Sequence, residues 1–402
     1  MTGLLGDWAN LLLRWTHFIA GIAWIGSSFY FIWLDRALSA PPPPPSPTQP
    51  RPGVEGELWM VHSGGFYQTE KRRPGPGEMP AVLHWFKWEA LFTWITGIAL
   101  LVLVYYLSEA YLLDPSVSRI GHGTATALGI TLLVVGWVVY DLLWGSSLAA
   151  PRTEWVAATI SLLLLGVVTI ASCRLLSGRA AYMHVGALLG TLMVANVWIR
   201  ILPAQQAMID ATKVGRQPDF TLGERAKRRS VHNSYMTFPL LFIMLSNHYP
   251  ATYGSPANWL VLVLLFVAGA AVRHAMIGHG SAARWALVPA AGALLGAMFF
   301  SMPKGAPAPV TADGPAPRFA AVRAVVVQRC LPCHSRFPSD LTFGASPAGV
   351  AFDTPETIAR FAERIRVRAV ETQTMPLANK TGMTPDERAL LARWIAAGAP
   401  LR

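Results

Sequence analysis

Long apolar runs recur along the first three-quarters of the chain, separated by shorter polar and charged stretches. A helix needs about 20 predominantly apolar residues to cross the hydrocarbon core of a bilayer, and these runs have that length. The pattern therefore predicts an all-α, polytopic membrane bundle over residues 1–301. We expect about eight spans, which cover residues 7–35, 85–108, 122–144, 154–176, 181–203, 233–249, 257–278 and 283–301.

The pattern changes after the last of these runs. Residues 302–317 are rich in proline, alanine and glycine, which predicts an extended linker. Residues 318–402 have the mixed composition of a small soluble domain. Its last helix is marked by Thr384 as N-cap, by Glu387 completing a capping box, and by Gly398 after the end.

This tail carries the pattern Cys-x-x-Cys-His at Cys330, Cys333 and His334, which is the attachment signature of a c-type haem. The two thiols would hold the ring covalently, and the adjacent imidazole would be the proximal iron ligand. Met375, followed by a proline, supplies a sixth ligand. Half of a zinc site and a redox disulfide are the alternatives. Zinc lacks further ligands, because no other Cys or His occurs in residues 318–402. The tail therefore predicts a mono-haem domain like a class I cytochrome c.

Charge adds an orientation to this picture. The net charge is +11, but the basic residues fall mostly between the expected spans, which argues against nucleic acid as a partner. An even number of spans places both termini on one side, and haem c is attached outside the cytoplasm. We therefore expect a bacterial inner-membrane protein with a periplasmic N-terminus and tail, and the positive-inside rule agrees. Expected cytoplasmic loops carry Arg51, Lys71, Arg72, Arg73, Arg152, Lys213, Arg216, Arg225, Lys227, Arg228, Arg229, Arg273 and Arg284. Expected periplasmic loops carry Arg119, Arg174 and Arg179.

Ionisable and amide groups inside the expected spans form two layers, and such groups are costly enough in a bilayer to suggest function. The layer near the expected periplasmic side holds His17, His122, His184 and His248. The layer near the cytoplasmic side holds His84, Lys87, Glu89, Asn196, Arg200, His232, Asn233 and His274. The alternative for each histidine is a helix-end residue bonded to a carbonyl group or water. For Arg200 the alternative is snorkelling to the interface.

Five dispersed segments make the chain similar to a known family. They are LLRWTHFIAGIAWIGSSFYFIWLD from Leu12, GELWMVHSGGFYQTEK from Gly56, LHWFKWEALFTWITG from Leu83, NVWIRILPAQQAMI from Asn196 and RSVHNSYMTFPLLFIMLSNHYP from Arg229. In this order they resemble the bacterial membrane-bound urate oxidases, which join a polytopic domain to a C-terminal cytochrome c. The resemblance implies oxidation of urate to 5-hydroxyisourate. It also implies that electrons pass to the haem c and then to a soluble cytochrome or a terminal oxidase.

A urate site needs a base, cationic or amide groups for the anion, and an electron acceptor. We expect it in the cytoplasmic-side layer, where those residue types are dense. The candidates are His84, Lys87, Glu89, Asn196, Arg200 and His232, with His62 as a lid residue. A bis-His haem b held by two of His17, His122, His184 and His248 would then bridge the membrane to haem c, with His17 as the first ligand. In the competing interpretation urate binds in that second layer itself, and no haem b is needed.

Two other functions fit the same sequence. One is an electron-transfer subunit that oxidises quinol and has no purine substrate. The other is a haem-binding assembly or transport protein with an attached redox sensor. Urate-dependent reduction of the c-haem would separate all three functions.

Overall fold

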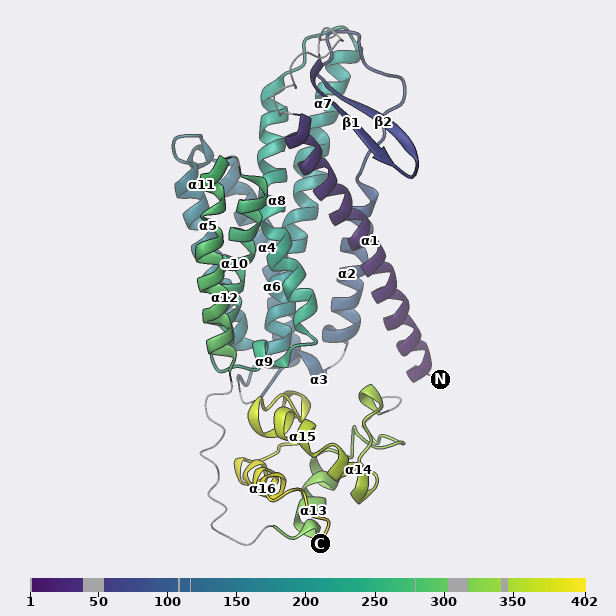
Figure 1. Ribbon diagram of the computed structural model, residues 1–402, viewed down its shortest axis with the longest axis vertical. Helices are drawn as coiled ribbons and strands as arrows, with labels where there is room; N and C mark the ends of the chain where they lie inside the picture. The colour runs from purple at the N-terminus through teal and green to yellow at the C-terminus, as the bar shows by residue number, and fades with distance from the viewer. Residues whose placement is uncertain are drawn as a thin grey trace.

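The computed structural model describes residues 2–38, 54–107, 109–115, 117–278, 280–302, 317–340 and 346–402. Most of them form a long helical bundle with a smaller helical domain at one end (Figure 1). The helices of the bundle are α1 (Thr2–Leu38), α2 (Trp88–Leu101), α3 (Glu109–Leu112), α4 (His122–Gly145), α5 (Glu154–Leu175), α6 (Gly178–Ala195), α7 (Leu202–Lys213), α8 (Phe220–Ser246), α9 (Pro250–Tyr253), α10 (Asn258–Ile277), α11 (Gly280–Arg284) and α12 (Leu287–Ser301). Short helical segments η1 (Val102–Tyr106), η2 (Ser147–Ala149) and η3 (Asn196–Ile201) extend or connect them.

Seven helical stretches are long and apolar enough to cross a membrane. They are Leu5–Leu38, Trp88–Tyr106, His122–Gly145, Glu154–Leu175, Gly178–Lys213, Asn258–Ile277 and Gly280–Ser301. These correspond to seven of the expected spans, so the chain is compatible with a multi-pass membrane protein. The expected span over 233–249 lies in α8, whose many polar residues keep its hydropathy below that of the others. Helix α8 packs side by side with α6 and α10. Because its own hydropathy does not mark it as a span, its crossing of a membrane stays a prediction.

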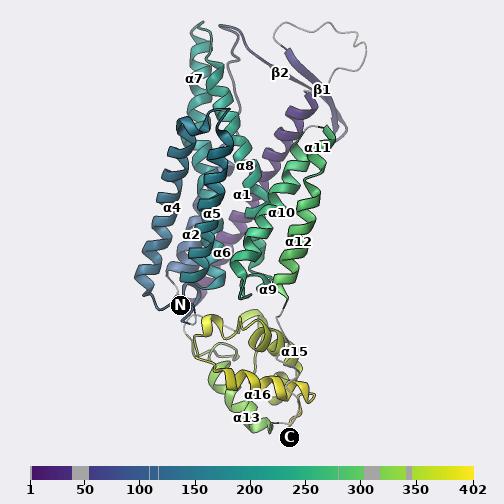
Figure 2. The same cartoon turned by 90° about the vertical axis from the view of Figure 1, so that its left-hand side faces the viewer.

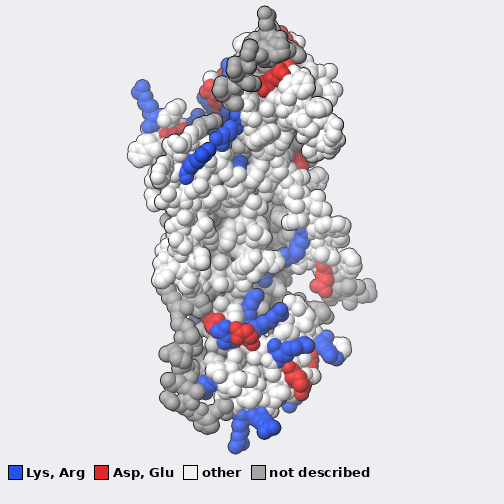
Figure 3. All heavy atoms as spheres, in the orientation of Figure 1, with Lys and Arg blue, Asp and Glu red and all other residues white. Residues whose placement is uncertain are grey.

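The two ends of the bundle differ. The N-terminus of α1 and the C-terminal domain lie at one end, and α7 lies at the other (Figures 1 and 2). We call these the domain end and the far end. Lys, Arg, Asp and Glu gather toward the far end and over the C-terminal domain, whereas the middle of the bundle is largely uncharged on the face drawn in Figure 3. This distribution is compatible with an apolar environment around the middle of the bundle.

Two arginines expected in cytoplasmic loops are buried on helices instead. Arg229 is on α8 and Arg273 on α10, and their exposures are 7% and 2%. Arg273 donates a hydrogen bond to the hydroxyl of Ser234 at 2.7 Å and lies over the ring of Phe29 at 4.1 Å. Charge counting placed both arginines in loops because it takes no account of a partner on a neighbouring helix.

The expectation of an all-α chain is wrong at one place. Residues of the segment between the first two spans form an antiparallel hairpin of β1 (Val54–His62) and β2 (Gly65–Arg72). Ser63 and Gly64 connect the strands, and both have positive φ angles, of 50° and 77°. Two positive φ angles in a two-residue loop are typical of the type I′ turn, whose twist matches that of the paired strands.

The C-terminal domain is a small helical unit around its own apolar core. Its elements are α13 (Phe319–Arg329), η4 (Pro347–Gly349), α14 (Pro355–Arg360), α15 (Ala362–Ile365), η5 (Arg366–Glu371), η6 (Leu377–Asn379) and α16 (Pro385–Ala396). Leu391 and Trp394 of α16 are fully buried in this core. The predicted capping box is confirmed, since Thr384 and Glu387 each bond the backbone N–H of the other. Most of the expected linker, residues 303–316, lies outside the described residues.

Candidate functional site

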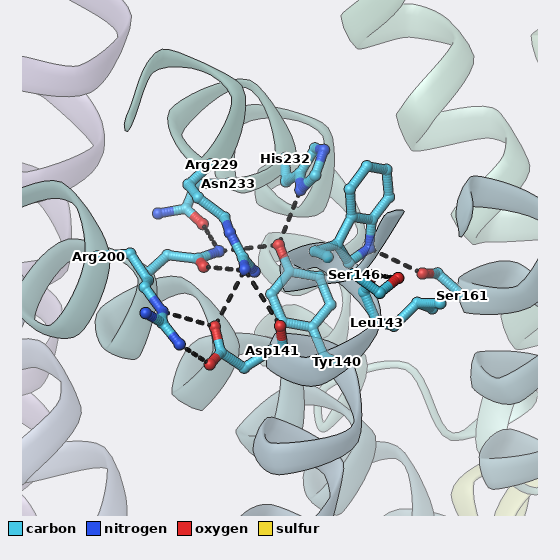
Figure 4. A network of polar contacts seen from close by, with 11 residues as sticks. Tyr140, Asp141, Leu143, Ser146, Ser161, Arg200, Arg229, His232 and Asn233 are labelled. Atoms are coloured by element: carbon cyan, nitrogen blue, oxygen red, sulfur yellow. Dashed lines mark hydrogen bonds and ion pairs between the residues drawn. The ribbon is translucent and has the colours of Figure 1, made fainter. Parts of the chain in front are cut away.

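Two arginines share one carboxylate near the far end of the bundle (Figure 4). Arg200 of η3 grips both carboxylate oxygens of Asp141 on α4, with Nε 2.8 Å from Oδ1. Arg229 of α8 approaches the same Oδ1 to 3.0 Å through Nη2. Three elements that are distant in sequence are thereby fastened together. The carboxylate offsets one of the two positive charges, and Arg200 meets it as a bidentate fork.

A chain of neutral polar groups continues from these ion pairs (Figure 4). The fully buried Asn196 donates from Nδ2 to the Tyr140 hydroxyl at 3.0 Å and to Asn233 Oδ1 at 2.9 Å. Tyr140 Oη lies 2.8 Å from Nδ1 of His232. Asn233 donates in turn to the carbonyl of Met193 at 2.9 Å. Each of these groups finds its partner within the protein, which is what buried polar groups require.

The structure thus brings three of the predicted site residues, Asn196, Arg200 and His232, into one network. Tyr140, Asp141 and Arg229 belong to it and were not predicted. Asp141 lies inside the expected span 122–144, so the signal of an ionisable residue within an apolar run was present for it too. Tyr140 gave no such signal, because a tyrosine near a helix end is common in membrane proteins.

The remaining predicted residues lie apart from this network. Lys87 sits among the rings of Trp85, Trp88 and Trp198 at 5.5, 5.5 and 5.7 Å, an arrangement that favours a cation without a carboxylate. His84 is exposed and touches the ring of Phe86. Glu89 is half-buried, and its Oε2 has no hydrogen-bond partner among the described residues. His62 lies at the exposed tip of the β hairpin, bonded to the neighbouring Ser63, and none of the contacts described here links it to Asn196 or His232.

A large apolar cavity lies beside the network. Its volume is about 1080 Å³, and α4, α5, α6 and α8 contribute most of its lining. Tyr140, Trp144 and His232 line it as well. The His232 ring lies 4.0 Å from that of Trp144. The charged residues in the lining are Glu154, Glu224, Lys227 and Arg228, and the rest of it is mostly apolar. Such a space suits a long apolar molecule with a small polar head better than a urate anion.

The four histidines predicted to offer haem b ligands are bonded to backbone or side-chain groups in different ways. His17 Nδ1 lies 2.9 Å from the carbonyl oxygen of Thr93 on α2. His184 is fully buried, with Nδ1 bonded to Ala180 and Nε2 to the Tyr106 hydroxyl. His122 bonds the Tyr106 carbonyl, and His248 is exposed near the end of α8. His122 and His184 thus share Tyr106 as a neighbour, but these contacts identify no bis-His pair among the described residues, and haem b stays a prediction.

The Cys-x-x-Cys-His residues of the C-terminal domain have surroundings that are compatible with a haem ligand set. His334 Nδ1 lies 2.9 Å from the carbonyl oxygen of Val350, which leaves Nε2 as the lone-pair nitrogen for a metal. Cys330 and Cys333 are both free thiols and half-buried. Met375 is half-buried and packs against the core of the same domain. The residues present fit a covalent haem c.

The thiols do not fit the alternative of a redox dithiol. Burial raises the pKa of Cys330 to about 12, and burial with the nearby Asp340 carboxylate raises that of Cys333 to about 11. Thiol–disulfide exchange needs a thiolate, and redox-active Cys-x-x-Cys pairs have a lowered pKa. The surroundings of these cysteines therefore favour the protonated thiol over the thiolate that thiol–disulfide exchange needs.

Comparison with known proteins gives one match. Residues 3–302 match the family model described as urate oxidase N-terminal. No curated protein and no solved structure matches the chain. The matched range covers the whole helical bundle and ends before the C-terminal domain begins, so it concerns the membrane-compatible part of the molecule and not its Cys-x-x-Cys-His motif.

Proposed function

The chain belongs to the urate oxidase N-terminal family, and from this premise we propose that it is a membrane-bound urate oxidase whose electrons leave through its own C-terminal domain. The reaction adds water to urate and gives 5-hydroxyisourate, two protons and two electrons. The bundle would bind the anion, and a respiratory partner would take the electrons. On this proposal the domain end of the bundle faces the periplasm of a bacterial inner membrane.

The observation that carries the proposal is the joining of two parts in one chain. The bundle has the family match, and the C-terminal domain holds Cys330, Cys333, His334 and Met375 in surroundings that fit a haem c. The cysteines would hold the ring, and the histidine and methionine would ligate the iron. When bound, such a haem supplies a one-electron acceptor of raised potential. A soluble cytochrome or a terminal oxidase is the partner that this chemistry suits.

The residues of the chain supply binding and proton transfer. Urate oxidation releases protons, so a lone-pair nitrogen near the substrate is needed, and the anion needs donors that are not already neutralised. The far-end network has His232 and two arginines, but Asp141 already takes up both guanidinium groups. At the domain end, among the described residues, Arg14 and Arg179 have no carboxylate within 4.0 Å, in contrast to Arg200 and Arg229.

A second candidate function is oxidation of quinol by the same chain. The cavity beside the far-end network favours it, because that cavity is apolar, about 1080 Å³ in volume, and has Tyr140 and His232 in its lining. A quinol has a long apolar tail and a head that exchanges hydrogen bonds with such groups. The family match favours urate over this candidate.

Anaerobic membranes that contain the full-length protein test both candidates. Addition of urate should reduce the c-haem, seen in the visible absorbance bands, and 5-hydroxyisourate should accumulate in proportion. Met375→Ala is the matched control, since it should lower the haem potential and leave urate binding intact. Reduction by a short-chain quinol but not by urate would favour the second candidate. Absence of any c-type haem from the purified protein would contradict the proposed route for electrons.

A further inference from the structure

Arg179 lies at the domain end of the bundle, next to the start of α6. Its guanidinium carbon is 4.8 Å from the centre of the Tyr111 ring, and its Nε donates to Asn247 Oδ1 at 2.9 Å. Tyr111 is held in place through Ser177, whose hydroxyl donates to the Tyr111 carbonyl at 2.6 Å. Arg179 is therefore positioned by its neighbours through Nε and one face, and its charge also acts on the hydroxyls of Tyr105 and Tyr111.

Tyr105 lies beside this arginine and carries an unsatisfied hydroxyl. Its ring centroid is 6.3 Å from that of Tyr111, and the residue is 3% exposed. Among the described residues its buried hydroxyl has no hydrogen-bond partner of normal geometry. Leaving a buried polar group unpaired costs about 1–3 kcal/mol, so a group in this state is a natural place for a ligand atom.

A second arginine increases the positive charge at this place. Arg14 of α1 is within electrostatic reach of Arg179, Tyr105 and Tyr111. Within the described ranges neither Arg14 nor Arg179 has a carboxylate within 4.0 Å, in contrast to Arg200 and Arg229. Two like charges near each other repel, and an anion close to both would offset the energy of that repulsion. The domain end thus has uncompensated positive charge next to an unpaired hydroxyl.

The same cluster adjoins the C-terminal domain. Helix α3, which carries Tyr111, packs against η6, the segment that follows Met375. Tyr111 is also within electrostatic reach of Cys333. The far-end network is much more distant, because α4 alone has 24 residues and spans ~36 Å at 1.5 Å per residue. Direct electron transfer over such a distance is slow, whereas the domain end needs no intermediate carrier.

We propose that Arg14, Arg179 and the hydroxyl of Tyr105 bind the planar urate anion at the domain end of the bundle, next to the domain that carries the Cys-x-x-Cys-His motif. The inference rests on the proposed function and adds the location of its substrate. A guanidinium fork donates two parallel hydrogen bonds to adjacent oxygen and nitrogen acceptors, which urate presents along its edges. Tyrosine rings suit the flat face of a purine.

His17 supplies a proton acceptor at this site. It lies on α1 one turn after Arg14, on the same side of the helix, and is within electrostatic reach of it. Because Nδ1 lies 2.9 Å from the Thr93 carbonyl oxygen, the proton resides there and Nε2 carries the lone pair. This use of His17 excludes its use as a haem ligand.

Binding of radiolabelled urate to the dithionite-reduced full-length protein in detergent tests the location, since a reduced protein does not turn the substrate over. Arg179→Gln should weaken binding roughly 10- to 100-fold, as expected for lost charge-assisted hydrogen bonds. Arg179→Lys keeps the charge but loses the fork, so its affinity for urate should lie between those of the wild type and Arg179→Gln. Tyr105→Phe should weaken binding roughly tenfold. Arg174→Gln, at the same end on α5, is the matched control for loss of one positive charge and should bind as the wild type does.

The outcomes separate the location from the function. Haem content and the haem potential should be the same in wild type and Arg179→Gln, while KM for urate rises and kcat changes little. Wild-type affinity in Arg179→Gln, with weakened binding in Arg200→Gln, would overturn the location and favour the far-end network. Absence of both urate binding and urate-dependent haem reduction in the wild type would overturn the proposed function, and this inference with it. Haem b in the purified protein, lost on His17→Ala, would overturn the role of His17.

Discussion

The two ends of the bundle treat their arginines differently. At the far end Arg200 and Arg229 share Asp141, and Arg229 stacks on Tyr140, with its guanidinium carbon 5.0 Å from the ring centre. At the domain end, among the residues described, Arg14 and Arg179 have no carboxylate partner, and the nearby Tyr105 hydroxyl is unpaired. At the far end the polar groups pair with one another. At the domain end the positive charge and the Tyr105 hydroxyl are available to a ligand.

This difference separates a structural role from a binding role. A network in which each member is bonded to another holds helices together and gains little from a ligand, which would have to break existing bonds. Groups that stay unpaired lower the stability of the free protein and recover it on binding. Natural proteins tolerate such local defects at functional sites. The density of polar residue types, which led us to predict the far end from sequence, does not distinguish the two situations.

The largest expected effect on stability is at the far end. Asp141→Asn removes the carboxylate that two arginines share and leaves the buried Arg229 uncompensated. We expect the free energy of unfolding to fall by about 3 kcal/mol. Denaturant unfolding of the detergent-solubilised protein, followed by tryptophan fluorescence, measures it. Arg179→Gln should cost far less in the same assay, and an equal loss in both variants would break the comparison.

A tyrosine pair sharpens the comparison at a smaller scale. Tyr140→Phe removes a hydroxyl that bonds Asn196 and His232, so it should destabilise the protein by about 1 kcal/mol. Tyr105→Phe removes a hydroxyl without a partner and should leave stability unchanged or slightly raised. The two substitutions delete the same atom from the same residue type. Equal destabilisation by both would show that Tyr105 is bonded in the free protein.

The smallest loss within the far-end network is expected from Arg200→Gln. The Arg200 side chain is 49% exposed, and Arg229 still compensates Asp141 in its absence. Exposed ion pairs contribute little, so the loss should be about 0.5 kcal/mol. Thermal unfolding of the variant at low and at high salt measures it, and the difference from wild type should shrink at high salt. A loss as large as that of Asp141→Asn would mean that Arg200 is the principal partner.

The sequence predicted elements well where one residue pattern determines one structure. Seven apolar runs correspond to seven candidate spans, and the capping box at Thr384 and Glu387 formed as expected. It failed where structure depends on a partner elsewhere in the chain. Arg229 and Arg273 looked like loop charges, because their partners lie on other helices. Arg229 pairs with Asp141 of α4, and Arg273 contacts Ser234 of α8 and Phe29 of α1. The β hairpin was missed because its strands occupy a loop between spans.

The candidate sites show the same limit. Asn196 and His232 were predicted by residue type and depth, but their saturation by Tyr140 and Asn233 is visible only in three dimensions. Arg179 was assigned to a periplasmic loop by charge counting, although its ring contact and its bond to Asn247 hold it against the bundle. Residue type indicates what a group can do. Only packing decides whether that capacity is already used.

One close approach has a consequence for how the molecule behaves on dilution. A Cβ atom at Gly254, near α9, would lie 2.8 Å from Thr374 Cγ2 and 3.1 Å from the Thr372 carbonyl oxygen of the C-terminal domain. The backbone of the bundle therefore meets that domain directly. Because one chain carries both partners, each meets the other at a fixed effective concentration, in the millimolar range for short flexible connections. An interface too weak to hold two separate proteins together then remains formed at any protein concentration.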